Sequence, residues 1–202
     1  MRFLRRAQGV PPRLGVLPGA FHPPTRAHLA LAQAALDSLE TDEVLFVLPA
    51  EFPHKKYEAV NLDQRLDMLA AATRQDPRFS IAVSTGGLFL EIARECREAY
   101  GADVRLRFLC GRDTAERIVG WNYSGQPAID EQLYEYELLV APRQGGFATP
   151  PRLSAVIQHL PVDPSHDEVS SSEVRERIAR GDRWEHLVPE AIVRQVRERY
   201  GG

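Results

Sequence analysis

The sequence predicts an α/β fold: a Rossmann-like, doubly wound parallel sheet of about five strands, with helices on both faces and a helical C-terminus. Short apolar runs alternate along the chain with longer segments in which apolar residues recur at helical spacing. Runs that are apolar at every position are typical of strands buried on both faces, as in a parallel sheet covered by helices. Because 202 residues suffice for one such domain, we expect a single domain over residues 1–202, with residues 1–12 as a flexible tail.

Five apolar runs account for the predicted strands, and proline or glycine stops most of them. The expected strands are residues 14–17, 44–48, 79–83, 104–110 and 137–141. The expected helices begin near residue 26 and residue 114 and cover residues 62–73, 88–100, 172–180 and 188–200. Ligands of such sheets bind beyond the carboxyl ends of the strands, which points to the turns after Leu17, Leu48 and Cys110.

The composition excludes several classes of function. The net charge is −3, whereas a general nucleic-acid binder needs a basic surface to displace counterions from phosphates. The two cysteines, Cys96 and Cys110, form no CxxC pair, which argues against structural zinc and suits a reducing cytosol, so we expect a cytoplasmic protein. No run of about 18 apolar residues occurs, so the sequence predicts no membrane-spanning segment.

Residues 19–28, Gly-Ala-Phe-His-Pro-Pro-Thr-Arg-Ala-His, lie at a predicted strand-to-helix junction. Gly19 lets the backbone approach a ligand closely, and Thr25 is a good N-cap that places His28 in the first helical turn. The helix start favours a phosphate, and a histidine there can donate to a phosphate oxygen as charge builds up on it. The residues alone also fit a purely structural role, with Thr25 as a cap and His28 packed beside it.

Three further segments could bind phosphates or a ribose. Ser170, Ser171 and Ser172 open a predicted helix in which Ser171 or Ser172 could act as the cap, and Arg175 follows one turn later. Gly111 and Asp113 follow a strand, where Asp113 could accept from ribose hydroxyls, and Lys55 and Lys56 lie beyond another strand. Taken singly, each segment also fits an ordinary cap, turn or solvated surface. The loop over residues 120–130 is the best candidate for a mobile lid.

In this order, the segments resemble those of the nicotinate/nicotinamide mononucleotide adenylyltransferases, which belong to the nucleotidyltransferase superfamily. Residues 19–28 resemble the family's Gly-x-Phe-x-Pro-x-(His/Thr)-x-x-His element, and residues 170–175 its Ser-(Ser/Thr)-x-x-Arg element. Residues 109–113 are similar to its Gly-x-Asp element. Residues 53–55 with 65–69 are similar to its Pro-His-Lys and Arg-Leu-x-Met-Leu stretch, and residues 140–143 to its Val-x-Pro-Arg strand end. The resemblance extends from about Leu14 to Tyr200.

The resemblance implies a role for each matching residue. His28, Arg175 and Thr25 would be the catalytic residues, with His28 donating to the α-phosphate of ATP and Arg175 holding the β- and γ-phosphates. Trp121 would stack on a pyridine ring, which suits a flat aromatic side chain. The implied ATP-binding residues are Gly19, Phe21, Gly111, Asp113, Ser170, Ser171 and Ser172. The implied acceptor-binding residues are Ala20, Lys55, Lys56, Trp121 and Arg143.

The implied reaction is an in-line attack by the 5′-phosphate of a pyridine mononucleotide on the α-phosphorus of ATP, with release of pyrophosphate. No serine or cysteine has an obvious activating base, so the sequence predicts no covalent intermediate. Mg²⁺ would bridge triphosphate oxygens and keep most of its waters, so no protein metal ligands are expected. The expected partners are therefore ATP and a pyridine mononucleotide. Homo-oligomers are common in the family, although no residue pattern here indicates an interface.

The sequence departs from the family's pattern at three positions. Thr25 stands where bacterial members usually have histidine and resembles the eukaryotic enzymes, Ala27 replaces a common glycine, and Ala20 replaces a serine or threonine near the acceptor phosphate. These departures leave two alternatives open. One is cytidylyl or adenylyl transfer to another phosphorylated acceptor, and the other is a catalytically weak nucleotide sensor.

Overall fold

The structure is a computed structural model that describes residues 1–38, 40–50, 60–123, 125–142 and 146–201. Within these residues the chain forms a sheet of seven strands in the order β1-β4-β3-β2-β5-β6-β7. Strands β2 to β7 are parallel, and β1 is antiparallel to β4. The strands are β1 (Arg2–Arg5), β2 (Arg13–Pro18), β3 (Glu43–Pro49), β4 (Phe79–Ser84), β5 (Arg105–Gly111), β6 (Glu137–Ala141) and β7 (Ile157–His159).

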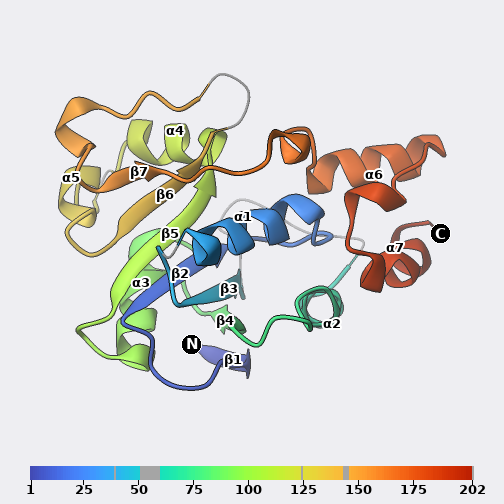
Figure 1. The fold of residues 1–202 in the computed structure, drawn as a ribbon, viewed down its shortest axis with the longest axis horizontal. Coiled ribbons are helices and arrows are strands. Elements are labelled where there is room, and N and C mark those ends of the chain that lie inside the picture. The colour runs from blue at the N-terminus through green and yellow to red at the C-terminus, as the bar shows by residue number, and fades with distance from the viewer. Residues whose placement is uncertain (39, 51–59, 124, 143–145, 202) are drawn as a thin grey trace.

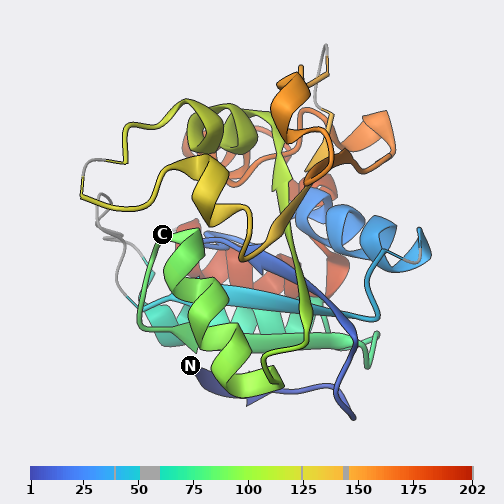
Figure 2. The ribbon, with the colours of Figure 1, turned by 90° about the vertical axis from the view of Figure 1, so that its left-hand side faces the viewer.

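Helices cover both faces of the sheet, which confirms the predicted fold class (Figures 1 and 2). Strand β3 shows the alternation behind this arrangement, since Leu45 and Val47 pack with α3 whereas Phe46 and Leu48 pack with α1 and α2. The helices are α1 (Arg26–Asp37), α2 (Leu62–Ala72), α3 (Phe89–Tyr100), α4 (Arg112–Gly120), α5 (Ile129–Gln132), α6 (Ser171–Arg180) and α7 (Val193–Tyr200). Short 3₁₀ turns are η1 (Pro151–Leu153), η2 (Pro164–His166), η3 (Glu185–Leu187) and η4 (Glu190–Ile192).

The C-terminal helices α6 and α7 lie at one end of the molecule, on the right in Figure 1. Val174 of α6 and Val196 of α7 form a third core cluster with Ile192 of the preceding 3₁₀ turn and Met68 of α2. Helix α7 begins at Val193, five residues later than the predicted start, because Pro189 precedes a separate 3₁₀ turn. This packing fixes α6, which carries the serines and Arg175, against the rest of the fold.

Strand β1 corrects the prediction that residues 1–12 are a flexible tail. Arg2 and Phe3 pair with Val83 and Ala82 of β4. The guanidinium of Arg5 donates to the carbonyl of Phe79 at 3.0 Å and to the carbonyl of Thr73 at 2.9 Å. The short segment Arg-Phe-Leu-Arg therefore completes the edge of the sheet.

The sheet reverses its order of addition between β2 and β5. From β2 the chain builds outward to β3 and β4, and it then returns to add β5, β6 and β7 on the other side. Val16 of β2 has Leu45 of β3 on one side and Phe108 of β5 on the other. A crevice forms beyond the carboxyl ends of the strands at such a switch point, and ligands bind there. Among the described helices, none has the length and apolar character needed to cross a membrane.

Candidate active site

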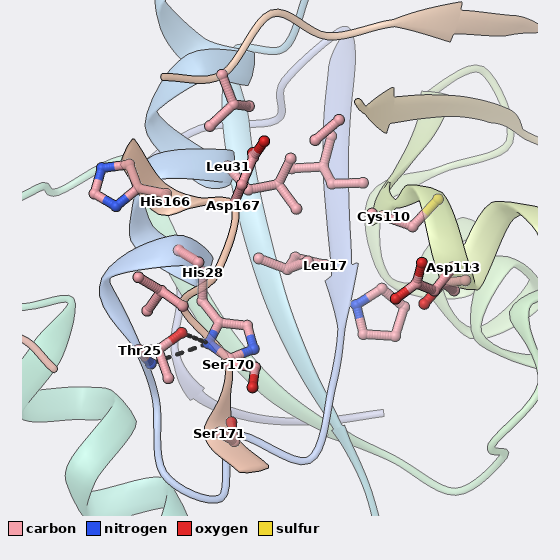
Figure 3. A pocket seen from close by; sticks show the side chains of 18 of the residues that line it. Leu17, Thr25, His28, Leu31, Cys110, Asp113, His166, Asp167, Ser170 and Ser171 are labelled. Atoms are coloured by element: carbon pink, nitrogen blue, oxygen red, sulfur yellow. Dashed lines mark hydrogen bonds between the residues drawn. The ribbon is translucent and has the colours of Figure 1, made fainter. Parts of the chain in front are cut away.

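The start of α1 fixes the orientation of His28. Thr25 is the N-cap, and its backbone N–H donates to Nδ1 of His28 at 3.0 Å. The Thr25 hydroxyl lies 2.8 Å from the same nitrogen. Because a backbone N–H can only donate, Nδ1 must be the acceptor, and the proton of the neutral ring is on Nε2. Both contacts are on one ring nitrogen in Figure 3, and the other nitrogen lies on the far side of the ring from Thr25.

The buried side chain of Phe21 packs against the imidazole of His28. Its ring packs edge-on against His28 with centroids 5.1 Å apart, and it also contacts Phe46 of β3. Its backbone has a φ of 47°, a left-handed conformation that is uncommon for a bulky residue. A Cβ at Gly19 would lie 3.1 Å from the Phe21 ring. Gly19 therefore avoids a close contact with the ring of Phe21, which a larger residue at this position would make.

Side chains from α2 and α6 hold the carbonyl groups of the loop that precedes α1. Arg65 donates to the carbonyl of Ala20 at 3.1 Å. Arg175 donates to the carbonyl of His22 at 2.6 Å, and the Ser171 hydroxyl donates to the carbonyl of Pro23 at 2.7 Å. The loop is thus connected to helices that lie more than 40 residues away in sequence.

His22 lies in the centre of this loop. Burial, together with the nearby guanidinium groups of Arg175 and Arg65, lowers the pKa of His22. The imidazole is therefore neutral at neutral pH. Its ring packs edge-on against Tyr200 of α7, with centroids 5.2 Å apart.

Helix α6 begins one serine earlier than predicted. Ser170 is the N-cap and accepts from the backbone N–H of Glu173 at 3.1 Å, whereas the sequence favoured Ser171 or Ser172 as the cap. Ser171 is free for this reason to bind the Pro23 carbonyl. Arg175 also donates to the Ser172 hydroxyl at 3.2 Å, so the serines and the arginine form one polar group at the helix start.

A cavity of about 420 Å³ lies beyond the carboxyl ends of β2, β5 and β6. It brings together seven of the predicted site residues, namely Ala20, Thr25, His28, Gly111, Asp113, Ser170 and Ser171. Figure 3 labels Thr25, His28, Asp113, Ser170 and Ser171 among them. The starts of α1 and α6 meet there, so backbone N–H groups and serine hydroxyls line a space of suitable size for a nucleotide. Gly19, Phe21, Ser172 and Arg175 do not line the cavity but support the loop and helix that do.

A second cavity of about 230 Å³ adjoins the first. Phe89 and Thr114 line both cavities, so the two cavities are neighbours that share part of their walls. Trp121, 54% exposed, lines the second cavity together with Tyr123. Within the described part of the chain, Arg117 is its one charged lining residue.

Three predicted acceptor-binding residues, Lys55, Lys56 and Arg143, lie outside the described residues, and their roles stay predictions. Conversely, the structure places side chains in the cavities that sequence reasoning assigned no role. Asp167 and His166 line the first cavity from the segment before α6, and Arg117 lines the second. No local pattern marks these residues, because only the folded chain brings them to the crevice.

The comparisons with known proteins agree with this geometry. Residues 16–177 match the cytidylyltransferase-like family. The chain is 32% identical to a probable nicotinate-nucleotide adenylyltransferase of Exiguobacterium sibiricum, over 92% of this chain and 96% of the relative. It is 29% identical to one of Moorella thermoacetica, over 94% and 91%. A Plasmodium falciparum nicotinic acid mononucleotide adenylyltransferase complexed with NaAD has the same fold, with a TM-score of 0.72 and 14% identity over 92% of this chain and 95% of that chain.

The chain therefore belongs to the cytidylyltransferase-like family of nucleotidyltransferases, and within it to the nicotinate/nicotinamide mononucleotide adenylyltransferases. The resemblance inferred from the motifs is confirmed. The protein is therefore an enzyme of the nucleotidyltransferase class.

Proposed function

We propose that the protein joins ATP to nicotinate mononucleotide, and less efficiently to nicotinamide mononucleotide, to form a dinucleotide and pyrophosphate in NAD biosynthesis. The observation that carries this proposal is the fixed imidazole of His28 at the start of α1, which lines a cavity that shares Phe89 and Thr114 with the aromatic cavity beside Trp121. The names of the most similar relatives support the same reaction.

In the proposed complex, ATP occupies the first cavity with its phosphates between the starts of α1 and α6. Nε2 of His28 donates to an α-phosphate oxygen, and this hydrogen bond strengthens as negative charge develops there in the transition state. Thr25 keeps the ring in the required tautomer through its contacts with Nδ1. Arg175, which contacts the His22 carbonyl behind the cavity wall, contributes positive charge to the field at the β- and γ-phosphates.

The chemical step is a direct displacement. An oxygen of the acceptor 5′-phosphate forms a bond to the α-phosphorus, and the bond from that phosphorus to the α,β-bridging oxygen breaks, so pyrophosphate leaves with the electron pair. Cys110 lines the cavity, but burial raises the pKa of its thiol to about 12. It is protonated at neutral pH and unsuited to act as a nucleophile. Catalysis therefore rests on positioning and charge stabilisation.

Mg²⁺ fits this arrangement as a companion of the triphosphate. Within the described ranges there is no group of three or more histidine, cysteine, aspartate or glutamate side chains that could hold a metal ion. Mg²⁺ bound to ATP needs few protein ligands because it keeps several waters. When bound, the ion neutralises charge on the triphosphate, and Asp113 and Asp167 are the carboxylates of the cavity that could hold its waters.

The second cavity is the proposed site of the pyridine ring. Trp121 offers a face for stacking, and Tyr123 and Phe89 complete the aromatic surroundings. Arg117 adds a positive charge to this cavity. We propose that this charge favours the carboxylate of nicotinate over the neutral amide of nicotinamide.

The test is pyrophosphate release by the purified protein with Mg²⁺-ATP and each acceptor in turn. We expect a higher kcat/KM with nicotinate mononucleotide, and we expect Arg117→Gln to reduce the acid-to-amide ratio by roughly 2- to 5-fold. Arg94→Gln, which removes an exposed arginine outside the cavity, is the matched control. Absence of release with both acceptors, in folded protein, would overturn the proposed reaction. An unchanged ratio in Arg117→Gln would overturn only the role of Arg117.

A further inference from the structure

The loop between β4 and α3, residues 85–88, has all four of its backbone N–H groups bound by carboxylates of α3. Glu95 Oε1 accepts from Thr85 at 2.9 Å and from Gly86 at 3.0 Å. Glu91 Oε2 accepts from Gly87 at 2.9 Å and from Leu88 at 3.0 Å. Two glutamates one helical turn apart thus bind four consecutive N–H groups.

Gly86 allows the helix to approach the loop this closely. A Cβ at this position would lie 2.4 Å from Cβ of Glu91 and 2.7 Å from its Oε2. The Ser84 hydroxyl holds the loop from the other side by donating to the carbonyl of Gly86 at 2.7 Å. In residues 84–88, Ser84 therefore fixes the loop by a hydrogen bond and Gly86 leaves space for the side chain of Glu91.

Only part of this arrangement is an ordinary helix cap. A glutamate at the third helical position commonly binds the N–H of the N-cap residue, as Glu91 does with Leu88. Glu95 lies one turn further along α3 and has no role in capping, yet it binds the first half of the loop. Because Glu95 binds Thr85 and Gly86, the hydrogen bonds from α3 hold the whole loop and not only the residue at the helix start.

The loop forms part of the wall of the second cavity. Gly87, Leu88 and Phe89 line that cavity together with Trp121, and Phe89 also lines the first cavity. Leu88 is 37% exposed. The conformation of the loop therefore sets the shape of the space beside Trp121.

We infer that Glu91 and Glu95 are positioning residues for the acceptor, because they hold residues 85–88 so that Leu88 and Phe89 form a preset wall of the cavity beside Trp121. This inference rests on the proposed function, since it takes that cavity as the site of the pyridine ring. The carboxylates do not touch the substrate in this role. They reduce the ordering that the loop would otherwise undergo on binding.

The decisive variants are Glu95→Ala and Glu95→Gln, with Glu98→Ala as the matched control, since Glu98 is an exposed glutamate of the same helix. Glu95→Ala should raise the KM for nicotinate mononucleotide roughly 2- to 30-fold, while the KM for ATP and kcat change little. Glu95→Gln should restore most of the affinity, because its carbonyl oxygen can still accept from Thr85 and Gly86. Glu91→Ala and Glu91→Gln should follow the same pattern.

Backbone hydrogen exchange gives a readout that does not depend on turnover. The N–H groups of residues 85–88 should exchange faster in Glu95→Ala and Glu91→Ala than in the wild type or in Glu98→Ala. If an alanine variant fails to fold, Glu95→Asp takes its place, because its carboxylate is one methylene shorter and should likewise raise the acceptor KM and speed the exchange of residues 85–88. Wild-type turnover with an acceptor KM unchanged by Glu95→Ala, or with both KM values raised equally, would overturn the inference alone. Wild-type protein without turnover would overturn the proposed function and this inference with it.

Discussion

Helices α1 and α3 begin in the same way but with opposite consequences. In each helix the third residue turns back and accepts a hydrogen bond from the backbone N–H of the N-cap residue. His28 accepts from Thr25 in α1, and Glu91 accepts from Leu88 in α3. The acceptor is a neutral ring nitrogen in the first case and a carboxylate oxygen in the second.

This difference decides which helix start remains available to an anion. At α3, the carboxylate of Glu91 already complements the positive end of the helix dipole, and Glu95 binds the loop before it. At α1, the imidazole satisfies the N-cap without adding negative charge, and its second nitrogen offers a proton to the cavity. The start of α1 can therefore bind a phosphate, whereas the start of α3 serves to shape a loop.

The largest expected effect is the loss of catalysis when the donor of α1 is removed. His28→Ala should lower kcat on the order of 10²- to 10³-fold, because a hydrogen bond that strengthens in the transition state is lost. The rate is measured as pyrophosphate release with saturating ATP and acceptor. His159→Ala, which changes an exposed histidine at the end of β7, should leave the rate unchanged. A decrease of less than tenfold in His28→Ala would show that α1 does not supply the catalytic donor.

A smaller effect is expected when the start of α1 is given the chemistry of α3. In His28→Glu, the carboxylate can still accept from Thr25, but it adds negative charge where we place the phosphates. ATP affinity, measured by titration without acceptor, should be roughly 2- to 30-fold weaker than in His28→Gln. His28→Gln is the matched neutral variant, and the melting temperatures of the two should be similar. Equal ATP affinities would mean that the charge of the capping group does not select between the two helix starts.

The sequence predicted the fold through its most regular segments. The five runs expected as strands are β2 to β6, because most of their residues are apolar, as in a sheet covered on both faces. Strand β1 was missed because Arg-Phe-Leu-Arg is a short segment with neither a continuous apolar run nor a strict alternation. Strand β7 was missed because a run of three residues carries no usable periodicity.

At the site, the sequence predicted the contacts between residues that are close together in the chain. Thr25 and His28 form a local cap, so their spacing alone indicates their geometry. The contact of Arg175 with the His22 carbonyl joins residues 153 positions apart, and no local pattern encodes it. Glu91 and Glu95 were missed for another reason, because two glutamates one turn apart look like the solvated face of a helix.

The smallest expected effect concerns the pH dependence of stability at α3. Burial alone would raise the pKa of Glu95, but the N–H group of Gly86, the α-ammonium of Met1 at 2.9 Å and the N–H group of Thr85 together hold it below its ordinary value of 4.5. The unfolded chain therefore binds a proton at higher pH than the folded chain, so Glu95 stabilises the fold above about pH 4.5 and loses this contribution as the pH falls through the folded pKa. A contribution of up to about 1 kcal/mol corresponds to roughly 2–4 °C in the melting temperature. The difference in Tm between the wild type and Glu95→Gln should thus shrink between pH 7 and pH 3, whereas Glu98→Gln should show no such trend. If the difference in Tm instead grows on acidification, the folded protein does not hold Glu95 in its ionised form. The contrast between α3, whose start is occupied by its own carboxylates, and α1, whose start is available to an anion, would then fail.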